Sequence, residues 1–226
     1  MSKKYRQVLL KISGDVFGQE SVLDSVVSQL VQLARRSVRL ALILGGGNIL
    51  RGRDNRELDA VSADHIGMLA TVINGIRLTD LLSRQIPVRH FSAFRVGTFV
   101  ESYTVTKARA SLQAGVLLIL TGGTGNPFFS TDSAAALRAA ELNMDVLLKG
   151  TRVRGVFSAD PEKEPDARFY PKLTYDQALQ QNLQVLDRTA ITLCQEYRIP
   201  IVVFDITRPR AILNIISGKK IGSVIC

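Results

Sequence analysis

Apolar residues recur along this chain with two spacings, and the two kinds of segment alternate. Runs in which nearly every residue is apolar predict buried strands over residues 7–13, 39–44, 88–93, 116–120, 145–149 and 200–206. Apolar positions three and four residues apart predict helices over residues 66–82, 106–114, 131–142 and 188–197, and another from Val22, where Ser21 and Asp24 fit a capping box. A last short helix is expected to open at Pro209, because proline suits a first helical turn.

Strands that alternate with helices predict right-handed crossovers and parallel pairing. The expected fold is therefore α/β, a three-layer sandwich with a mostly parallel central sheet, formed as a single domain by residues 1–226. In such a sheet, ligands bind at the carboxyl ends of the strands. Two long connections, residues 45–64 and 158–175, exceed the ~12 residues usual in a compact domain and are expected to be functional.

Composition narrows the class of protein. The chain has 226 residues, 46% of them hydrophobic, and its apolar runs are shorter than the ~20 residues of a membrane span, so we expect a cytoplasmic protein without a membrane segment. Two cysteines cannot build a disulfide framework or a thiolate metal cluster. The net charge of +9 suits anionic ligands, but the basic residues are scattered without a like-charge run, which disfavours nucleic-acid binding.

Glycine-bearing turns follow three of the predicted strands, at residues 11–14, 45–48 and 122–126. Glycine lets backbone N–H groups approach phosphate oxygens closely, and a nearby helix amino terminus adds partial positive charge. One such turn by itself is only a tight connection, whereas three at the same sheet edge favour a phosphate site. The phosphate-loop pattern G-x-x-x-x-G-K-[ST] and the dinucleotide pattern G-x-G-x-x-G are both absent from the sequence.

Two basic residues accompany these turns. Lys11 ends an otherwise apolar strand beside Gly14, and Arg51 follows the triple glycine. Lysine is rarely buried without a partner, so Lys11 is hard to explain as a surface charge. Phosphoryl transfer needs positioning and positive charge more than covalent chemistry, and both residues could supply that charge.

Several motifs resemble those of bacterial UMP kinases in the amino-acid-kinase family. The resemblance lies in K-I-S-G at residues 11–14, GGGN-x-x-RG at 45–52, DH-x-GMLAT-x-x-N at 64–74, TGNPFF-x-TDS at 124–133 and K-x-T-x-V-x-GVF-x-x-DP at 149–161. It extends over residues 5–225. It implies transfer of the γ-phosphate of ATP, with Mg²⁺, to UMP in pyrimidine nucleotide biosynthesis, by a homohexamer.

The resemblance implies an ATP-binding lobe at about residues 144–226, joined by residues from the first turns. The implied ATP contacts are Lys11, Ile12, Ser13, Gly14, Gly47, Arg51, Thr151, Phe157 and Asp160. One departure concerns Arg154, which stands where the family commonly has Asp, so the polar pairing of that position cannot be transferred.

The same resemblance implies a UMP-binding lobe at about residues 1–143. Gly46 is expected at the UMP phosphate and Asp64 at the ribose hydroxyls, although Asp64 alone also fits an ordinary carboxylate at a helix amino terminus. The loop expected to read the uracil consists of Thr124, Gly125, Asn126, Pro127, Phe128, Phe129, Ser130 and Thr131. The two phenylalanines could equally be core residues.

The implied catalytic group contains Lys11, Arg51, Asp132 and Asp187, and no protein metal site is expected. Asp132 could support Mg²⁺, orient Lys11 or cap a helix, and Asp187 could organise the cations or cap the helix before Arg188. Two alternatives remain open. One is a family member that phosphorylates a carboxylate or carbamate, and the other is a nucleotide-sensing or nucleic-acid-binding regulator without turnover.

Overall fold

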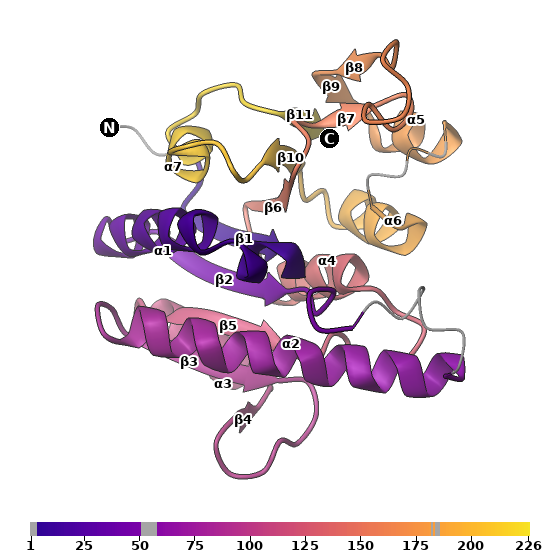
Figure 1. Ribbon diagram of the computed structural model, residues 1–226. Helices are drawn as coiled ribbons and strands as arrows, with labels where there is room; N and C mark the ends of the chain where they lie inside the picture. Colours follow the sequence, from indigo (N-terminus) through magenta and orange to yellow (C-terminus); the bar gives the residue numbers. More distant parts are fainter. Residues whose placement is uncertain (1–3, 51–57, 182, 184–185) are drawn as a thin grey trace.

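The computed structural model describes residues 4–50, 58–181, 183 and 186–226. A nine-stranded sheet runs through it in the order β4-β3-β5-β2-β1-β6-β10-β11-β9, and β7 and β8 form a separate pair (Figure 1). The strands are β1 (Gln7–Ile12), β2 (Arg39–Leu44), β3 (Val88–Ser92), β4 (Glu101–Ser102), β5 (Leu117–Thr121), β6 (Val146–Thr151), β7 (Val156–Phe157), β8 (Phe169–Tyr170), β9 (Lys172–Leu173), β10 (Ile201–Asp205) and β11 (Ser223–Ile225).

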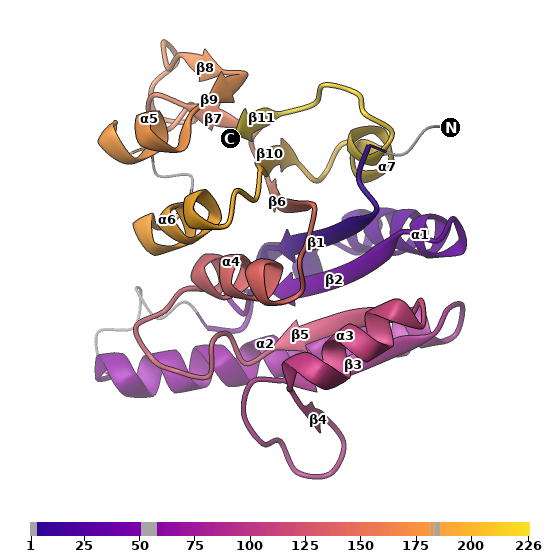
Figure 2. The ribbon, with the colours of Figure 1, turned by 180° about the vertical axis from the view of Figure 1, so that it is seen from behind.

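Helices cover both faces of this sheet. They are α1 (Glu20–Arg35), α2 (Ala60–Ser83), α3 (Val105–Gln113), α4 (Thr131–Glu141), α5 (Tyr175–Gln180), α6 (Arg188–Glu196) and α7 (Ala211–Ile216), with a 3-10 turn η1 (Gly14–Gly18) after β1. One core cluster packs α1, α2 and α7 on one face, and a second packs α3, α4, α5 and α6 on the other. Figures 1 and 2 show these layers from opposite sides, which confirms the predicted three-layer sandwich.

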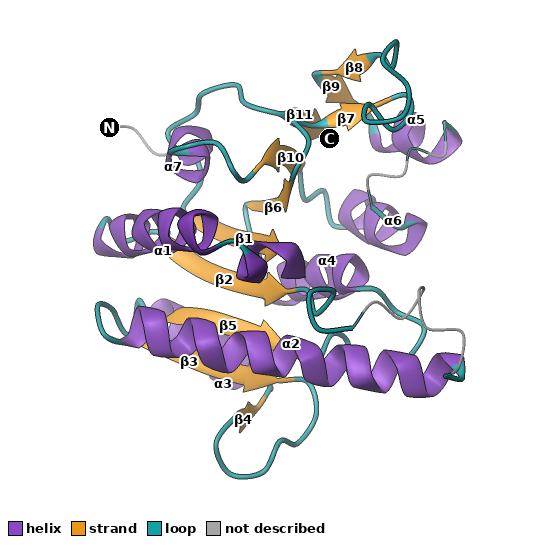
Figure 3. Ribbon diagram, in the orientation of Figure 1, coloured by secondary structure: helices purple, strands orange, loops and turns teal. Residues whose placement is uncertain are grey.

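Pairing in the sheet is mostly parallel, as predicted. Strands β5, β2, β1, β6 and β10 are parallel neighbours, and within the described part of the nine-stranded sheet the one antiparallel pair is β10 with β11. Parallel strands present their carboxyl ends at one edge. The three glycine turns, which follow β1, β2 and β5, therefore meet at the same edge of the sheet (Figure 3).

Several predicted boundaries are wrong. Helix α1 begins at Glu20, directly after η1, and its cap residue Gln19 makes no side-chain bond, so Ser21 and Asp24 form no capping box. Helix α2 begins at Ala60, six residues earlier than predicted, because the Asp59 carboxylate accepts the N–H groups of its first turn. Pro209 is not in a first turn, since the short helix α7 begins at Ala211 after Arg210 with φ 61°.

The predicted long connection over residues 158–175 is not structureless. It contains β8 and β9, and β8 pairs with β7 in an antiparallel hairpin. Strands of two residues carry too few alternating positions for a periodic signal. The same reason explains why β4 was missed.

Helix α2 is the one helix among the described residues that is long and apolar enough to cross a membrane by length and composition. Contacts within the fold account for part of that composition. Leu78 and Leu82 lie in the core, and Thr71 and Asn74 form hydrogen bonds to the glycine turns. A helix that covers a sheet passes the same test as a membrane span.

Candidate functional site

Two lysines lie side by side where β1 and β6 end. Lys11 and Lys149 are register partners on these parallel strands, and both project toward Asp132 in the first turn of α4. The Lys11 Nζ is 3.1 Å from Oδ1 of Asp132, and the Lys149 Nζ is 2.6 Å from Oδ2. One carboxylate therefore pairs with both ammonium groups at the strand ends.

We call this cluster the lysine pair with Asp132. Burial and the neighbouring charges shift the pKa values of its groups. Burial by itself would raise the pKa of Asp132, but the charges of Lys11 and Lys149 outweigh it and lower that pKa. Burial lowers the pKa of Lys149, and the nearby charge of Lys11 adds to that effect against the attraction of Asp132.

Asp187 supports this cluster from α6. Its Oδ1 caps α6 by accepting the Ala190 N–H at 2.7 Å, and the same atom accepts the Ser133 hydroxyl at 2.8 Å. Its Oδ2 accepts the hydroxyl of Ser130, the cap residue of α4. The helix-cap interpretation is confirmed, and Asp187 also adds a negative charge that favours the charged form of Lys149.

The first two glycine turns are in direct contact. A Cβ atom on Gly14 would lie 2.7 Å from the Gly47 nitrogen, and one on Gly45 would lie 2.8 Å from the Gly14 nitrogen. The Gly45 N–H donates to the Ile12 carbonyl at 2.8 Å, and the Ile12 side chain is fully buried in the core. Only residues without side chains allow this approach, which brings the backbone of both turns next to Lys11.

Helix α2 holds the second and third turns in place. The buried side-chain amide of Asn74 donates to the Gly45 carbonyl at 2.7 Å and to Oδ1 of Asn48 at 2.8 Å. The Thr71 hydroxyl accepts the Gly122 N–H at 2.8 Å. Asn74 and Thr71 belong to the quoted motif but were not predicted as site residues, because a helix pattern does not show which polar side chains reach a loop.

A cavity of about 160 Å³ opens between α2, the glycine turns and α4. It is lined by Gly46, Gly47, Leu50, Asp64, Gly67, Met68, Thr71, Gly123, Asn126, Phe129, Ser130 and Thr131. Six residues expected at UMP are among them: Gly46, Asp64, Asn126, Phe129, Ser130 and Thr131. The expected residues Thr124, Gly125, Pro127 and Phe128 lie in the same loop but outside the lining.

Asp64 lies inside α2 and does not open it. Its Oδ2 accepts the Phe128 N–H at 2.6 Å and so ties α2 to the loop across the cavity. Phe128 has a left-handed backbone with φ 68°, and the residue is 74% exposed. A bulky residue in that conformation is strained, which is typical of functional loops. The exposure excludes the alternative that Phe128 is a core residue.

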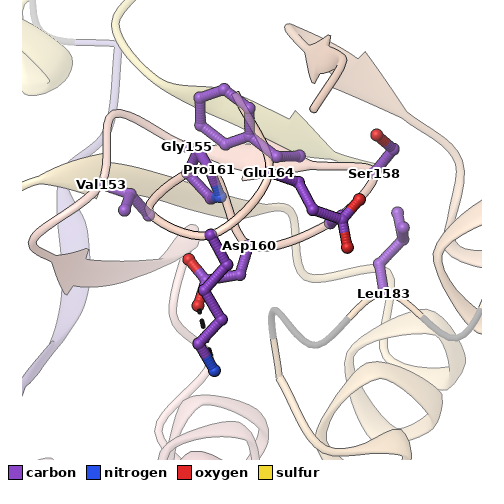
Figure 4. A pocket seen from close by; sticks show the side chains of 10 residues that line it. Val153, Gly155, Ser158, Asp160, Pro161, Glu164 and Leu183 are labelled. Atoms are coloured by element: carbon purple, nitrogen blue, oxygen red, sulfur yellow. Dashed lines mark ion pairs between the residues drawn. The ribbon is translucent and has the colours of Figure 1, made fainter. Parts of the chain in front are cut away.

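A second cavity of about 530 Å³ lies in the carboxyl-terminal half (Figure 4). Its lining includes Phe157 and Asp160, which were expected at ATP, together with Val153, Gly155 and Pro161. Asp160 forms an ion pair with Lys163 at 3.8 Å, drawn as the dashed line in Figure 4. Thr151 is not in the lining, and its hydroxyl donates to the Val153 carbonyl at 2.7 Å.

The two remaining expectations have different outcomes. Arg51 lies outside the described residues. Lys149 was missed as a site residue, although a lysine at the end of an apolar strand is the same signal that drew attention to Lys11. Only the register of β1 with β6 shows that the two lysines are neighbours.

Comparison with known proteins places the chain in a family. The model of the amino acid kinase family matches residues 6–205. The chain is similar to a uridylate kinase of Methylococcus capsulatus, with 43% identity over 98% of this chain and 97% of that protein. It is also similar to a uridylate kinase of Legionella pneumophila strain Lens, with 44% identity over 98% of this chain and 94% of the relative.

Solved structures agree with this relationship. A UMP kinase from Bacillus anthracis superimposes with a TM-score of 0.93 and 33% identity, covering 98% of this chain and 96% of that one. A UMP kinase from Ureaplasma parvum gives a TM-score of 0.90 and 34% identity, covering 100% and 99%. The family model and these relatives agree with the sheet order and with the glycine turns at one edge of the sheet. The chain therefore belongs to the amino acid kinase family.

Proposed function

We propose that this protein transfers the γ-phosphate of ATP to the phosphate of UMP, giving ADP and UDP for pyrimidine nucleotide biosynthesis. The single observation that carries the proposal is the lysine pair with Asp132 at the glycine edge of the sheet. Phosphoryl transfer needs fixed positive charge around the transferring group, and this cluster holds two ammonium groups at the ends of neighbouring strands. The names of the similar proteins supply the acceptor, UMP.

The donor side is assigned to the first turns and the carboxyl-terminal half. Lys11 and the backbone of Ser13 and Gly14 would contact the ATP phosphates, together with Gly47. Phe157 and Asp160 line a cavity of about 530 Å³, which is large enough for a nucleoside. These residues describe an ATP-binding lobe at about residues 144–226 that is completed by the first turns.

The acceptor side is assigned to the cavity under α2. Gly46 and Gly47 lie at one side of this cavity and Asp64 lies in its lining. A carboxylate in that position accepts hydrogen bonds from two ribose hydroxyls, and the loop of Asn126 and Phe129 would face the base. Both cavities lie in a lobe of their own, which supports the division of the single domain at about residue 143.

In the reaction, an oxygen of the UMP phosphate forms a bond to the γ-phosphorus as the bond from that phosphorus to the bridging β–γ oxygen breaks. Lys11 and Lys149 would stabilise the charge that develops on the transferred group and on the leaving ADP. Asp132 positions both lysines through its two oxygens. No proton donor is required, because the leaving phosphate is stable as an anion.

Magnesium is expected to arrive with the ATP phosphates. The described residues contain no group of three or more His, Cys, Asp or Glu side chains that could hold a metal ion. Asp132 and Asp187 are already engaged by lysines, serines and a helix amino terminus. Mg²⁺ commonly keeps several waters and is bound through substrate phosphates, where it neutralises charge, so this arrangement is compatible with it.

We also propose a homohexamer and a cytoplasmic location. An exposed apolar stripe on α2, formed by Ile66, Leu69, Ile73 and Ile76, supports self-association, because contiguous apolar faces on a surface mark interfaces. Nothing in the described structure requires a membrane, since α2 is bonded to the glycine turns.

The test is a coupled assay of ADP release with MgATP over a panel of acceptors. UMP is expected to be the best acceptor and CMP and dTMP poor ones. Faster turnover of an acidic amino acid or carbamate would replace the proposal by another reaction of the family, and no turnover of any acceptor would favour a regulator. Lys11→Ala is expected to lower turnover by about 10²- to 10³-fold with UMP affinity nearly unchanged, whereas the exposed control Lys107→Ala should match the wild type.

A further inference from the structure

A third cavity, of about 700 Å³, lies where β9 and β11 meet the turns that follow β6 and β10, and we call it the basic groove. Its basic lining residues are Lys4, Arg154, Lys172, Arg208 and Lys220, and Phe169 adds an aromatic wall. None of its lining residues is shared with the two cavities assigned to the nucleotides. In Figure 1 these elements gather at the top, around β11, β9 and β7.

The charge of the basic groove is not balanced within it. Asp205 is the one acidic side chain in its lining, and it already accepts the N–H of Thr207 at 3.0 Å and the Thr207 hydroxyl at 2.6 Å. Arg208 pairs with the same carboxylate at 3.3 Å. Lys172 and Lys220 make no ion pair with any residue that the structure describes. Like charges held close together repel one another, which destabilises the folded protein. An anionic ligand bound among them would reduce this repulsion.

The arrangement suits a small ligand rather than a polymer. The basic side chains come from five separate segments, ahead of β1, after β6, on β9, after β10 and ahead of β11, and they meet around one cavity. A volume of about 700 Å³ lies in the range of small-molecule sites. A nucleic acid would instead require a stripe of basic residues that follows its backbone.

Arg154 gives the basic groove a preorganised donor. Its guanidinium lies 3.9 Å from the ring centre of Phe169 and 5.5 Å from that of Phe157, so both rings restrict its orientation. A planar guanidinium held in this way binds phosphate oxygens with a pair of N–H groups. The exposed side chains of Lys4, Lys172 and Lys220 add point charges that can contact additional phosphates.

We propose that the basic groove binds a small anion that carries two or more phosphate groups, at a site separate from both nucleotide cavities. The number of basic residues argues for several phosphates, because a single phosphate can contact only part of this lining. The proposal does not depend on the acceptor of the kinase reaction, since it rests on the charges and the cavity alone.

The test is calorimetric titration of the full chain with inorganic triphosphate. Lys172→Ser with Lys220→Ser removes two groove charges, and both side chains are exposed, so the fold should persist. Lys107→Ser with Lys219→Ser is the matched control, because it removes the same charge from exposed positions outside the groove. We expect the groove to bind one triphosphate per chain. The Kd of this site should rise at least tenfold in the groove variant and stay unchanged in the control variant. Lys172→Arg with Lys220→Arg should retain it.

Titrations with other ligands and at other salt concentrations test the proposal further. Inorganic phosphate should bind the groove at least tenfold more weakly than triphosphate, and rising salt should weaken both. Equal binding by the wild type and the groove variant would overturn the proposal, as would an equal loss in the control variant. An RNA oligonucleotide that binds in a groove-dependent way while triphosphate does not would also overturn it and assign the surface to nucleic acid.

Discussion

Asp132 shows how one residue can set the electrostatics of a site. Its carboxylate is shared by Lys11 and Lys149, so removal of its charge would leave two ammonium groups close together and partly buried. Breaking a buried ion pair by removing one partner commonly costs about 3–5 kcal/mol. The cluster therefore couples the stability of the strand ends to the charge that phosphoryl transfer needs.

Asp64 is the residue at which the proposed acceptor site can be tested separately from the proposed donor site. Asp64→Asn is expected to raise the KM for UMP by about tenfold to a hundredfold, because an amide offers one acceptor and one donor in place of a charged acceptor pair. The KM for ATP should change much less, since the ATP cavity is formed by other residues. Steady-state kinetics with each substrate varied in turn measure both effects.

The matched control for that experiment is Asp59→Asn on the same helix. Asp59 caps α2, and asparagine is an equally good cap residue, so stability and both KM values should stay close to the wild type. An unchanged KM for UMP in Asp64→Asn would show that Asp64 only ties α2 to the Phe128 loop.

His90 predicts a pH dependence of stability. Burial lowers the pKa of His90 from 6.5 to about 4, and its Nε2 lies 2.8 Å from the Thr121 hydroxyl. As pH falls, the His90 side chain of the unfolded chain binds a proton before that of the folded chain. The free energy of unfolding is therefore unaffected by His90 above about pH 6.5 and decreases between pH 6.5 and 4. The loss at pH 5 should be about 2 kcal/mol.

Urea unfolding at pH 7 and pH 5 measures that loss. The His90→Gln variant should lack this pH-dependent loss of stability. The His65→Gln variant, which alters an exposed histidine of the same chain, should show the loss unchanged. The same pH dependence in both variants would contradict the assignment to His90.

At the scale of elements, helix α2 joins the fold to the site. Gly75 allows α2 to approach the sheet, because a Cβ atom there would lie 2.5 Å from His90 Nε2 and 2.6 Å from Thr121 Cγ2. Thr71, one helical turn before Gly75, and Asn74, directly before it, form hydrogen bonds to the glycine turns. The distance between α2 and the sheet therefore also fixes the position of the turns.

Gly75→Ala is expected to destabilise the protein by about 1–3 kcal/mol, because the added methyl group pushes α2 from the sheet. Gly67→Ala is the control on the same helix, where a Cβ atom would meet nothing within 4 Å. That substitution should raise stability by up to ~1 kcal/mol through helix propensity. Thermal or urea unfolding of both variants measures the contrast, and equal effects would show that Gly75 makes no close packing contact.

At the scale of the whole molecule, one sheet carries both nucleotide cavities. β1 and β6 are central neighbours, so the two halves of the chain meet at the lysine pair. The cavity proposed for the acceptor lies on the side of α2 and α4, and the cavity proposed for the donor lies beside the β7–β8 hairpin. If the proposed assignment is right, the donor and the acceptor approach the lysine pair from different halves of the chain.

Self-association is predicted to depend on the exposed apolar stripe of α2. Ile73 is 55% exposed near the middle of that stripe, and Ile73→Glu should reduce the oligomer to smaller species by placing a charge in the contact. Tyr197→Glu alters a residue that is 59% exposed at the carboxyl end of α6 and should leave the oligomer intact. Light scattering at micromolar concentration measures the mass, and a wild-type monomer would refute the proposed hexamer.

The sequence by itself determined the features that are local in the chain. Apolar periodicity located the long helices and the central strands, and the glycine turns with Lys11 indicated the phosphate edge, because spacing within a segment decides which side chains share a face. The motifs identified the family, which the comparisons confirm. Short strands and cap positions were missed, since a few residues carry too little periodic signal.

Only the tertiary structure decided which distant residues meet. The register of β1 with β6 makes Lys149 the neighbour of Lys11, and the position of α4 places Asp132 between them. The contact of Asp64 with the Phe128 N–H joins residues 64 positions apart. The basic groove likewise joins five segments whose charges look scattered along the chain. Sheet order and crossovers create these contacts, because they depend on how whole elements pack and not on the residues beside each position.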